Sequence, residues 1–329
     1  MAVVTPDPEG IARAVAVLRR GKLVGMPTET VYGLAGDATN PEAVARVFAA
    51  KGRPRFDPLI VHLPPTALAE RLPAWVHPEA LARVQRVGDA LWPGPLTLVV
   101  PRAAGVLDLV TSGLDTVAVR VPSHPVAQAL LEAFGPVVAP SANRFGRISP
   151  TRAADVVEEL GDKVPVVLDG GACRIGVEST VVGLADAAQP VLFRPGGTPL
   201  EAVEALLGPL ASAPDPGSAP TSPGQLASHY APRTRLVLVD RLEDEPALLS
   251  GAAVLRARGG EALPSGVCAG EVLAPSGSSI EAAQRLFGAL RRLDAVGASR
   301  IVVERWGDAE GLGAAIDDRL SRAAVPPLR

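Results

Sequence analysis

The chain has 329 residues, of which 47% are hydrophobic, and its net charge is −3. This length exceeds one ordinary hydrophobic core and favours two domains. The small net charge argues against a general nucleic-acid coat protein but allows a local basic cleft. The two cysteines, Cys173 and Cys268, indicate neither a disulfide framework nor a cysteine zinc site, which suits a reducing cytosol. Without a signal-like N-terminus or an apolar run of about 20 residues, we expect a cytoplasmic protein that does not enter the membrane.

Hydrophobic periodicity predicts a first α/β domain over residues 1–208. Helices are predicted at 7–20, 41–50, 78–91, 125–134 and 153–160. Strands are predicted at 22–26, 59–63, 96–100, 117–121, 137–139, 164–168, 180–184 and 191–193. Because helices and strands do not alternate strictly, the pattern favours a mixed sheet over a doubly wound parallel one.

The composition changes after this domain. Residues 209–232 are predicted to be a linker, because 211–224 is rich in Pro, Ser, Gly and Ala and has no apolar period. Residues 233–329 predict a small Rossmann-like domain, with strands at 235–239, 252–255 and 300–303 and helices at 280–293 and 311–323. No G-x-G-x-x-G follows a strand there, so nothing suggests dinucleotide binding.

Lys51 and Arg53 are candidate anion-binding residues. Lysine is scarce, occurring only at positions 22, 51 and 163, whereas arginine is abundant. A lysine beside an arginine offers a point charge and a planar fork together, as phosphate recognition often requires. The same pair could instead be a solvated helix end at which cations offset the helix dipole.

The segment Pro27-Thr-Glu-Thr-Val-Tyr-Gly33 follows the first predicted strand directly. Thr28 and Thr30 supply hydroxyl groups, and we expect Gly33 to permit an unusual backbone turn. An ordinary turn between a strand and a helix is the alternative interpretation.

Arg120 lies on an otherwise apolar strand, on the same face as Thr116 because strand side chains alternate. A buried arginine without a counter-ion is costly, so an anion is expected nearby. That anion is either a structural Asp or Glu, or a substrate carboxylate held by two parallel hydrogen bonds. His62 ends another apolar strand, where histidine is more often a satisfied core residue than a ligand-binding one.

Further polar residues follow the later strands. Ser141 and Asn143 can bond phosphate or ribose oxygens, and Ser149 leads into a helix whose first N–H groups favour anions. A polar turn that caps a helix is the simpler alternative. Ser179 and Arg194 add a hydroxyl and a cation beside turn glycines. There is no P-loop, nucleophile elbow or zinc-protease motif, so a nucleotide would not be held by a P-loop.

Taken in order, these motifs resemble the threonylcarbamoyl-AMP synthase family, also called the YrdC or Sua family. The matching elements are Pro-Thr-Glu-Thr-Val-Tyr-Gly, Lys-Gly-Arg-Pro, Pro-Leu-Ile-Val-His, Ser-Ala-Asn, Glu-Ser-Thr-Val and Arg-Pro-Gly, within residues 27–196. The segment 222–232 and the domain after it are similar to those of the longer, two-domain members.

The resemblance implies a YrdC-like mixed-sheet domain with a concave active-site cleft. It implies a nucleotidyltransferase that condenses L-threonine, bicarbonate and ATP to threonylcarbamoyl-AMP and pyrophosphate, with Mg²⁺ carried by the ATP phosphates and no protein nucleophile. Partner proteins then transfer the threonylcarbamoyl group to the adenosine beside the anticodon of tRNA. Threonine contacts are implied for Thr30, His62, Thr116, Arg120 and Ser179. ATP contacts are implied for Lys51, Arg53, Asp57, Ala139, Ser141, Asn143, Ser149, Arg194 and Tyr230.

The implied ATP contacts of two positions, Asp57 and Tyr230, each have an alternative. The family often has asparagine where this chain has Asp57, which can accept a hydrogen bond but repels phosphate. Tyr230 is expected to fold over the nucleotide as part of a lid, or else to anchor the start of the second domain.

Two other functions compete with synthesis. One is a non-catalytic RNA-binding domain that uses the same basic cleft; few aromatics and the small net charge weaken it. The other is a carbamoyl-transferring enzyme of the hydrogenase-maturation type, whose acylphosphatase-like domain and cysteine zinc motifs are missing from this sequence.

Overall fold

The computed structural model describes residues 1–66, 68–186, 189–213, 222, 228–259 and 262–325. They form two compact units. The first holds most of the chain before residue 214, and the second holds most of the chain after 227 together with Gly146–Ser149 and Arg174–Val177. Within the described residues, no helix is long and apolar enough to cross a membrane.

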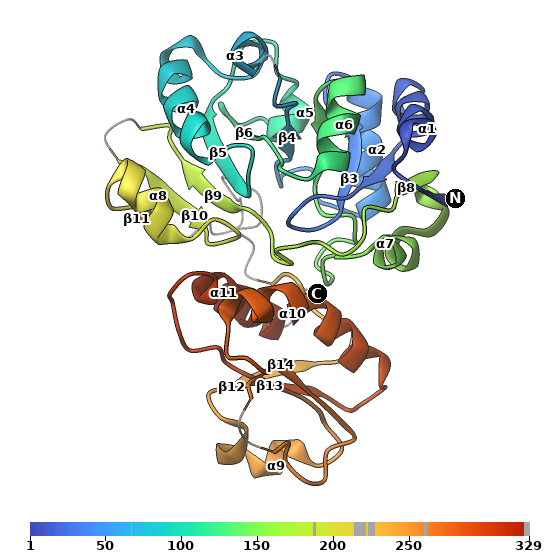
Figure 1. The fold of residues 1–329 in the computed structure, drawn as a ribbon, viewed down its shortest axis with the longest axis vertical. Helices are drawn as coiled ribbons and strands as arrows, with labels where there is room; N and C mark the ends of the chain where they lie inside the picture. Colours follow the sequence, from blue (N-terminus) through green and yellow to red (C-terminus); the bar gives the residue numbers. More distant parts are fainter. Residues whose placement is uncertain (67, 187–188, 214–221, 223–227, 260–261, 326–329) are drawn as a thin grey trace. The chain divides into compact units, whose positions relative to one another are not determined.

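The first unit is built on a large mixed sheet (Figure 1). Its strands are β1 (Ala2–Val4), β2 (Val24–Met26), β3 (Gly33–Asp37), β4 (Ile60–His62), β5 (Leu96–Pro101), β6 (Thr116–Arg120), β7 (Val137–Val138), β8 (Val166–Leu168), β9 (Thr180–Gly183), β10 (Val191–Arg194) and β11 (Ala211–Ser212). They are arranged in the order β1-β8-β2-β3-β7-β4-β6-β5-β9-β10-β11. Parallel pairs such as β4 with β6 alternate with antiparallel pairs such as β5 with β6, which confirms the predicted mixed sheet.

Helices cover this sheet and bury two clusters of apolar side chains. They are α1 (Pro8–Arg19), α2 (Pro41–Lys51), α3 (Leu68–Arg71), α4 (Pro78–Leu91), α5 (Asp108–Thr111), α6 (Pro125–Phe134), α7 (Ala153–Leu160) and α8 (Leu200–Leu207), with 3₁₀ turns η1 (Leu72–Ala74) and η2 (Gly161–Lys163). The first cluster takes residues of α2, α4 and α7, and the second takes those of α1 and α6. Successive residues along the chain pack into different clusters, as Leu23 and Val24 do, because side chains on a strand point alternately to the two faces of the sheet.

Local signals fix the ends of α2, which carries Lys51. The Asn40 side chain caps the helix by accepting hydrogen bonds from the N–H groups of Glu42 and Ala43. Pro41 occupies the first turn, where its missing N–H costs nothing. Gly52 ends the helix in the left-handed conformation, with φ of 64°. Lys51 therefore lies at a sharply defined helix end.

The segment after β2 differs from the predicted turn. Residues 33–37 form β3, which pairs antiparallel with β2 and with β7. Gly33 is not in the left-handed region, so the prediction of an unusual turn at this glycine is wrong. Glycine is favoured here because the backbone at this position runs close to Ala139: an added Cβ would lie 3.1 Å from Cβ of that residue. This strand was not predicted from its sequence, Gly-Leu-Ala-Gly-Asp, because glycine is uncommon in strand interiors.

The second unit is a four-stranded parallel sheet of β12 (Leu236–Val239), β13 (Ala253–Arg258), β14 (Ala269–Ala274) and β15 (Ile301–Glu304), in the order β12-β15-β13-β14. Helices α10 (Ser279–Ala295) and α11 (Gly313–Ala324) pack side by side against this sheet (Figure 1). A separate apolar cluster joins it to the 3₁₀ turn η3 (Leu242–Asp244) and to α9 (Pro246–Leu249). Strand β14 was not predicted, because its first residues lack an apolar pattern.

The predicted linker is only partly described. Residues 214–221 and 223–227 lie outside the described residues. Of its first residues, Ala211 and Ser212 form β11 and pair in parallel with β10. The main sheet therefore extends past position 209, where the linker was predicted to begin.

We predict that Gly196→Ala destabilises the first unit by about 1–3 kcal/mol, the usual cost of overpacking. An added Cβ would lie 2.3 Å from the carbonyl carbon of Ser179 and 2.4 Å from the carbonyl oxygen of Glu178, both of which are backbone atoms. Urea unfolding of the full chain measures the change. Gly105→Ala is the matched control, because an added Cβ there meets nothing within 4 Å. Equal unfolding midpoints for the two variants would show that the 196 loop does not need this close approach.

Candidate active site

One face of the neighbouring strands β4, β6, β5 and β9 carries two rows of side chains. The first row is a small apolar cluster made of Ile60, Val99, Ala118 and Val181. Two residues along these strands, on the same face, lie the polar side chains of His62, Arg120 and Thr97. The register pairs Thr97 with Val181, so Ser179, which precedes β9, joins this polar row through its hydroxyl contact with Thr97. The strand register places His62 beside Arg120, as Ile60 is beside Ala118. A polar row therefore runs across the sheet next to an apolar patch.

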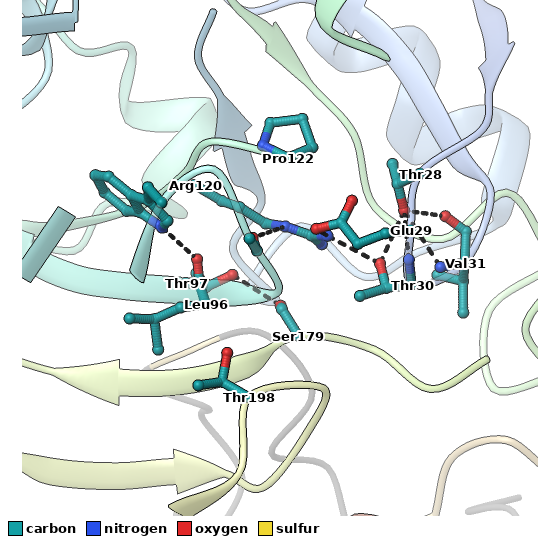
Figure 2. Close-up of polar contacts among 12 residues, drawn as sticks. Thr28, Glu29, Thr30, Val31, Leu96, Thr97, Arg120, Pro122, Ser179 and Thr198 are labelled. Carbon is teal, nitrogen blue, oxygen red and sulfur yellow. Dashed lines mark hydrogen bonds and ion pairs between the residues drawn. The ribbon is translucent and has the colours of Figure 1, made fainter. Parts of the chain in front are cut away.

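Arg120 is buried and has a carboxylate partner within the chain. Its Nη2 donates to Oε1 of Glu29 at 2.6 Å and to the Thr30 hydroxyl at 3.1 Å, while Nε donates to the carbonyl oxygen of Gly94 at 3.3 Å (Figure 2). The Arg120 and Glu29 side chains are only 5% and 2% exposed. Burial alone would raise the pKa of Glu29, but the charge of Arg120 and its hydrogen bond lower that pKa below its ordinary value. Glu29 is therefore a buried anion.

The structure thus supplies the structural partner that was one of the two alternatives for Arg120. Glu29 was not among the predicted site residues, although it lies inside the Pro-Thr-Glu-Thr motif. Nη1 of Arg120 makes no hydrogen bond with any described residue. Glu29 and Thr30 fix the orientation of the guanidinium, and a ligand contact through Nη1 stays a prediction.

His62 is buried beside this cation. Burial, and then the charge of Arg120, lower the pKa of His62 to about 3. Nδ1 lies 3.3 Å from the carbonyl oxygen of Ile60. The imidazole is therefore neutral at physiological pH and offers one donor and one acceptor, not a charge.

A chain of hydrogen bonds links the polar row to a second buried cation. The hydroxyl groups of Thr97 and Ser179 lie 2.8 Å apart (Figure 2). Arg194 then donates from Nε and Nη2 to the carbonyl oxygen of Ser179, at 3.2 and 3.0 Å, and from Nη2 to its hydroxyl at 3.3 Å. Thr97 is a second residue that was not predicted, since a threonine in an apolar strand carries no signal of its own. The structure brings together Ser179 and Arg194, which had been assigned to different substrates.

Thr116 lies apart from this row. It is four residues before Arg120 on β6, a separation of about 13 Å along a strand. Ala118 of the apolar cluster lies between them on the same face. A threonine molecule held at Arg120 is too small to reach Thr116 as well, so a contact there requires a longer ligand.

Lys51, at the end of α2, holds a neighbouring loop. Its Nζ donates to the carbonyl oxygens of Ser141 and Asn143, the second at 2.7 Å. Burial, and then the nearby charge of Arg53, lower the pKa of Lys51 to about 7. The ammonium therefore holds the 141–143 loop in place and sits near the midpoint of its titration at neutral pH.

Arg53 and Asp57 form a second buried ion pair. Nη2 of Arg53 lies 2.8 Å from Oδ1 of Asp57, and the side chains are 6% and 1% exposed. Arg53 also donates to the carbonyl oxygens of Asp57 and Pro58. Burial raises the pKa of Asp57 despite the opposing attraction of Arg53, Lys51 and Arg194. This geometry gives Asp57 a role in fixing Arg53; a direct contact with ATP stays a prediction.

Two of the buried cations make no hydrogen bond with a carboxylate among the described residues, although the charges of Asp57, Glu159 and Glu178 act on Lys51. Within the described residues, Lys51 and Arg194 donate only to carbonyl and hydroxyl oxygens. Both lie near enough to Asp57 to act on its pKa, so they belong to one neighbourhood. Burying charge that is not neutralised is costly, and a bound anion would remove that cost. The charges of this neighbourhood therefore favour an anionic ligand.

The remaining predicted residues are placed as follows. Ala139 is buried, and its N–H is already bonded to the carbonyl oxygen of Ile60 at 3.1 Å, so its backbone contact with ATP stays a prediction. Ser149 and Tyr230 belong to the second unit. There the Tyr230 ring stacks on Phe287 with 5.8 Å between centroids, and Arg319 lies 5.0 Å over it. These contacts suit an anchor of the second domain, and the ATP contacts of Ser149 and Tyr230 stay predictions.

Comparison with known proteins matches both parts of the chain. A family model of the Sua5, YciO and YrdC proteins, described as telomere recombination, matches residues 16–196. A second model, described as the C-terminal domain of threonylcarbamoyl-AMP synthase, matches residues 198–325.

Similar proteins extend over nearly the whole chain. A threonylcarbamoyl-AMP synthase of Pyrococcus abyssi is 40% identical over 94% of this chain and 93% of its own length. One from Bacillus subtilis is 39% identical over 97% and 94%. The crystal structure of P. abyssi Sua5 complexed with L-threonine superposes with a TM-score of 0.88 at 36% identity and covers 98% of both chains. The chain therefore belongs to the threonylcarbamoyl-AMP synthase family, in its two-domain Sua5 form.

Proposed function

We propose that the protein condenses L-threonine, bicarbonate and ATP to threonylcarbamoyl-AMP and pyrophosphate. The observation that supports this most strongly is the pair of buried cations that make no hydrogen bond with a carboxylate among the described residues, Lys51 and Arg194, next to the polar row of His62 and Arg120. The cations suit the phosphates of ATP. The row offers a cation for the carboxylate of an amino acid, and neutral hydrogen-bonding groups for its other atoms.

The chemistry needs two bond-forming steps. The amine of threonine attacks the carbon of bicarbonate, and water leaves as the carbamate forms. A carbamate oxygen then attacks the α-phosphorus of ATP, and the bond to the departing pyrophosphate breaks. No protein nucleophile is required, so the chain contributes by positioning the reactants and by neutralising phosphate charge. Correct positioning alone can lower a barrier by about 7–11 kcal/mol.

Arg194 has a particular part in this scheme. Its guanidinium is fixed by the backbone and hydroxyl of Ser179, which itself bonds Thr97 of the polar row. A cation held so rigidly does not have to reorganise when charge builds on the transferred phosphoryl group. We assign the reaction to the nucleotidyltransferases, because the α-phosphate with its adenosine is the group transferred.

Magnesium is part of the proposal as a companion of ATP. Among the described residues, no three His, Cys, Asp or Glu side chains gather to hold a metal ion. Such a cluster is not needed, because Mg²⁺ commonly binds through substrate phosphates with one or two carboxylates and several waters. Bound in this way, the ion would neutralise charge on the leaving pyrophosphate.

We further propose that the product passes to partner proteins, which transfer the threonylcarbamoyl group to the adenosine beside the anticodon of tRNA. A mixed anhydride of a carbamate and a phosphate hydrolyses readily, so prompt use is chemically sensible. Synthesis and transfer would then take place in the cytoplasm, where ATP and tRNA are available.

The first prediction concerns substrates. The purified protein should release pyrophosphate from ATP only when both L-threonine and bicarbonate are present, because only the carbamate attacks the α-phosphorus. Mass spectrometry of the products should show threonylcarbamoyl-AMP. Equal pyrophosphate release without threonine would contradict the proposal. Strongly salt-dependent RNA binding without ATP turnover would instead favour the RNA-binding alternative.

The second prediction concerns the proton on Lys51. At pH 8, a lysine with a pKa of about 7 is mostly neutral, and a bound phosphate should recharge it. ATP binding at pH 8 should therefore take up close to one proton. Calorimetry in buffers of different ionisation enthalpy measures this uptake. Lys51→Arg is the matched variant, because a guanidinium stays charged and needs no proton. Equal uptake by both proteins would place the titrating group elsewhere.

The third prediction concerns Arg120. Arg120→Lys keeps a positive charge beside Glu29 but loses the planar fork. Loss of a charge-assisted bond worth about 1.5–3 kcal/mol should raise the KM for threonine roughly 10- to 150-fold and change the KM for ATP much less. Arg13→Lys, on the exposed side of α1, is the control and should leave both constants unchanged. A larger effect on ATP than on threonine would overturn the assignment of Arg120 to the amino acid.

A further inference from the structure

The second unit contains a cavity at one edge of its sheet. Strands β12, β15 and β13 are neighbours and run parallel, ending at Val239, Glu304 and Arg258. A cavity of about 530 Å³ lies at these carboxyl ends. Open parallel sheets bind their ligands at this edge, and the volume is in the usual range for small-molecule sites. Position and size together make this cavity a candidate binding site.

The cavity is lined by guanidinium groups, two of them set firmly. Arg256 is only 4% exposed and donates from Nη2 to a carboxylate oxygen of Glu243 and to the carbonyl oxygen of Ala262. Arg258 donates from Nη1 to the carbonyl oxygen of Trp306 at 2.7 Å and lies over the indole ring, 3.9 Å from its centre. Arginine forks held in place in this way are pre-organised for an oxyanion.

The ion pairs of Arg258 and Arg305 with nearby aspartates are weaker contacts. Nη2 of Arg258 lies 3.8 Å from Asp308, and Nε of Arg305 lies 3.3 Å from Asp240. Arg258 and Arg305 are about 40% exposed, so these ion pairs are screened by water and contribute little. A phosphate group, which accepts two parallel hydrogen bonds from one guanidinium, can replace such partners with better geometry.

A carboxylate stands at the end of the central strand of this edge. Glu304 ends β15, and its Oε2 accepts a hydrogen bond from the N–H of Ala257 on β13 at 2.9 Å. This bond fixes the side chain across the two strand ends. An acidic residue at such a strand end is suited to accept hydrogen bonds from ribose hydroxyl groups. The cavity thus pairs phosphate-binding cations with a group that recognises sugar hydroxyls.

We propose that this cavity binds a nucleoside phosphate, with its phosphate on Arg258 and Arg305 and its ribose hydroxyls on Glu304. The site is separate from the polar row of the first unit and shares no residue with it. The chain has no G-x-G-x-x-G after a strand in this domain, which fits a mononucleotide better than a dinucleotide.

The three tryptophans allow a test on the intact protein. Trp306 lines the cavity, whereas Trp75 and Trp92 belong to the first unit, so three indole N–H signals report separately in a ¹H–¹⁵N spectrum. Loss of one signal in Trp306→Phe assigns it. AMP should then shift the Trp306 signal in a saturable way, whatever happens at the first unit. Adenosine at the same concentration should leave it unmoved, because the phosphate carries the interaction.

Variants and a second probe make the test decisive. Arg258→Ala combined with Arg305→Ala should weaken the AMP effect on Trp306 at least tenfold; both side chains are exposed enough for the fold to survive. Arg292→Ala is the control, because this exposed arginine of the same unit pairs with Glu271 away from the cavity. An AMP response that is unchanged in the double variant, or the lack of any saturable AMP response of the Trp306 signal, would overturn the proposal. Inorganic phosphate that binds as tightly as AMP would overturn the nucleoside part.

Discussion

The burial of cations in the first unit is the constraint on which its site depends. Arg120 and Arg53 form ion pairs with the buried carboxylates of Glu29 and Asp57, whereas Lys51 and Arg194 donate to carbonyl and hydroxyl oxygens. Burial and the charge of Arg53 lower the pKa of Lys51 to about 7, although the charges of Asp57, Glu159 and Glu178 oppose that shift. A buried cation without a close ion pair lowers stability, and a bound anion reduces that cost. The electrostatics therefore favour an anionic ligand.

The pairing of Arg120 with Glu29 gives the polar row a different electrostatic character from the neighbourhood of Lys51 and Arg194. Glu29 neutralises Arg120 and orients it, so the fork offers hydrogen-bond donors with little net charge. His62 adds a neutral imidazole, because the nearby arginine and burial prevent its protonation. A weakly charged, hydrogen-bonding row suits a zwitterion such as an amino acid, while Lys51 and Arg194 suit a polyanion. Pairing with Glu29 thus gives the polar row less net charge than the neighbourhood of Lys51 and Arg194.

Much of this site could be predicted from the sequence, and the limits have physical reasons. The helices over 78–91, 125–134 and 153–160 match the predicted bounds, because their apolar periods are long and clear. The motif residues Thr30, Lys51, Arg120, Ser179 and Arg194 do gather in the first unit. Glu29 and Thr97 were missed, since their importance comes from register and ion pairing across distant strands, which no local pattern contains. Strands β3 and β14 were missed because glycine interrupts their apolar pattern. The assignment of Gly146–Ser149 and Arg174–Val177 to the second unit likewise depends on contacts that a linear domain boundary cannot express.

Ser179 gives the site its internal connection. Its hydroxyl meets Thr97 in the polar row, and its carbonyl oxygen holds the guanidinium of Arg194. Gly196 keeps the Arg194 loop against this residue, because any side chain there would collide with the backbone of residues 178–180. A shift of Ser179 would therefore move the guanidinium of Arg194. Substitutions along this chain of contacts should not act additively, since residues that share partners are energetically coupled. The close packing of one small loop thus makes the two halves of the site a single unit.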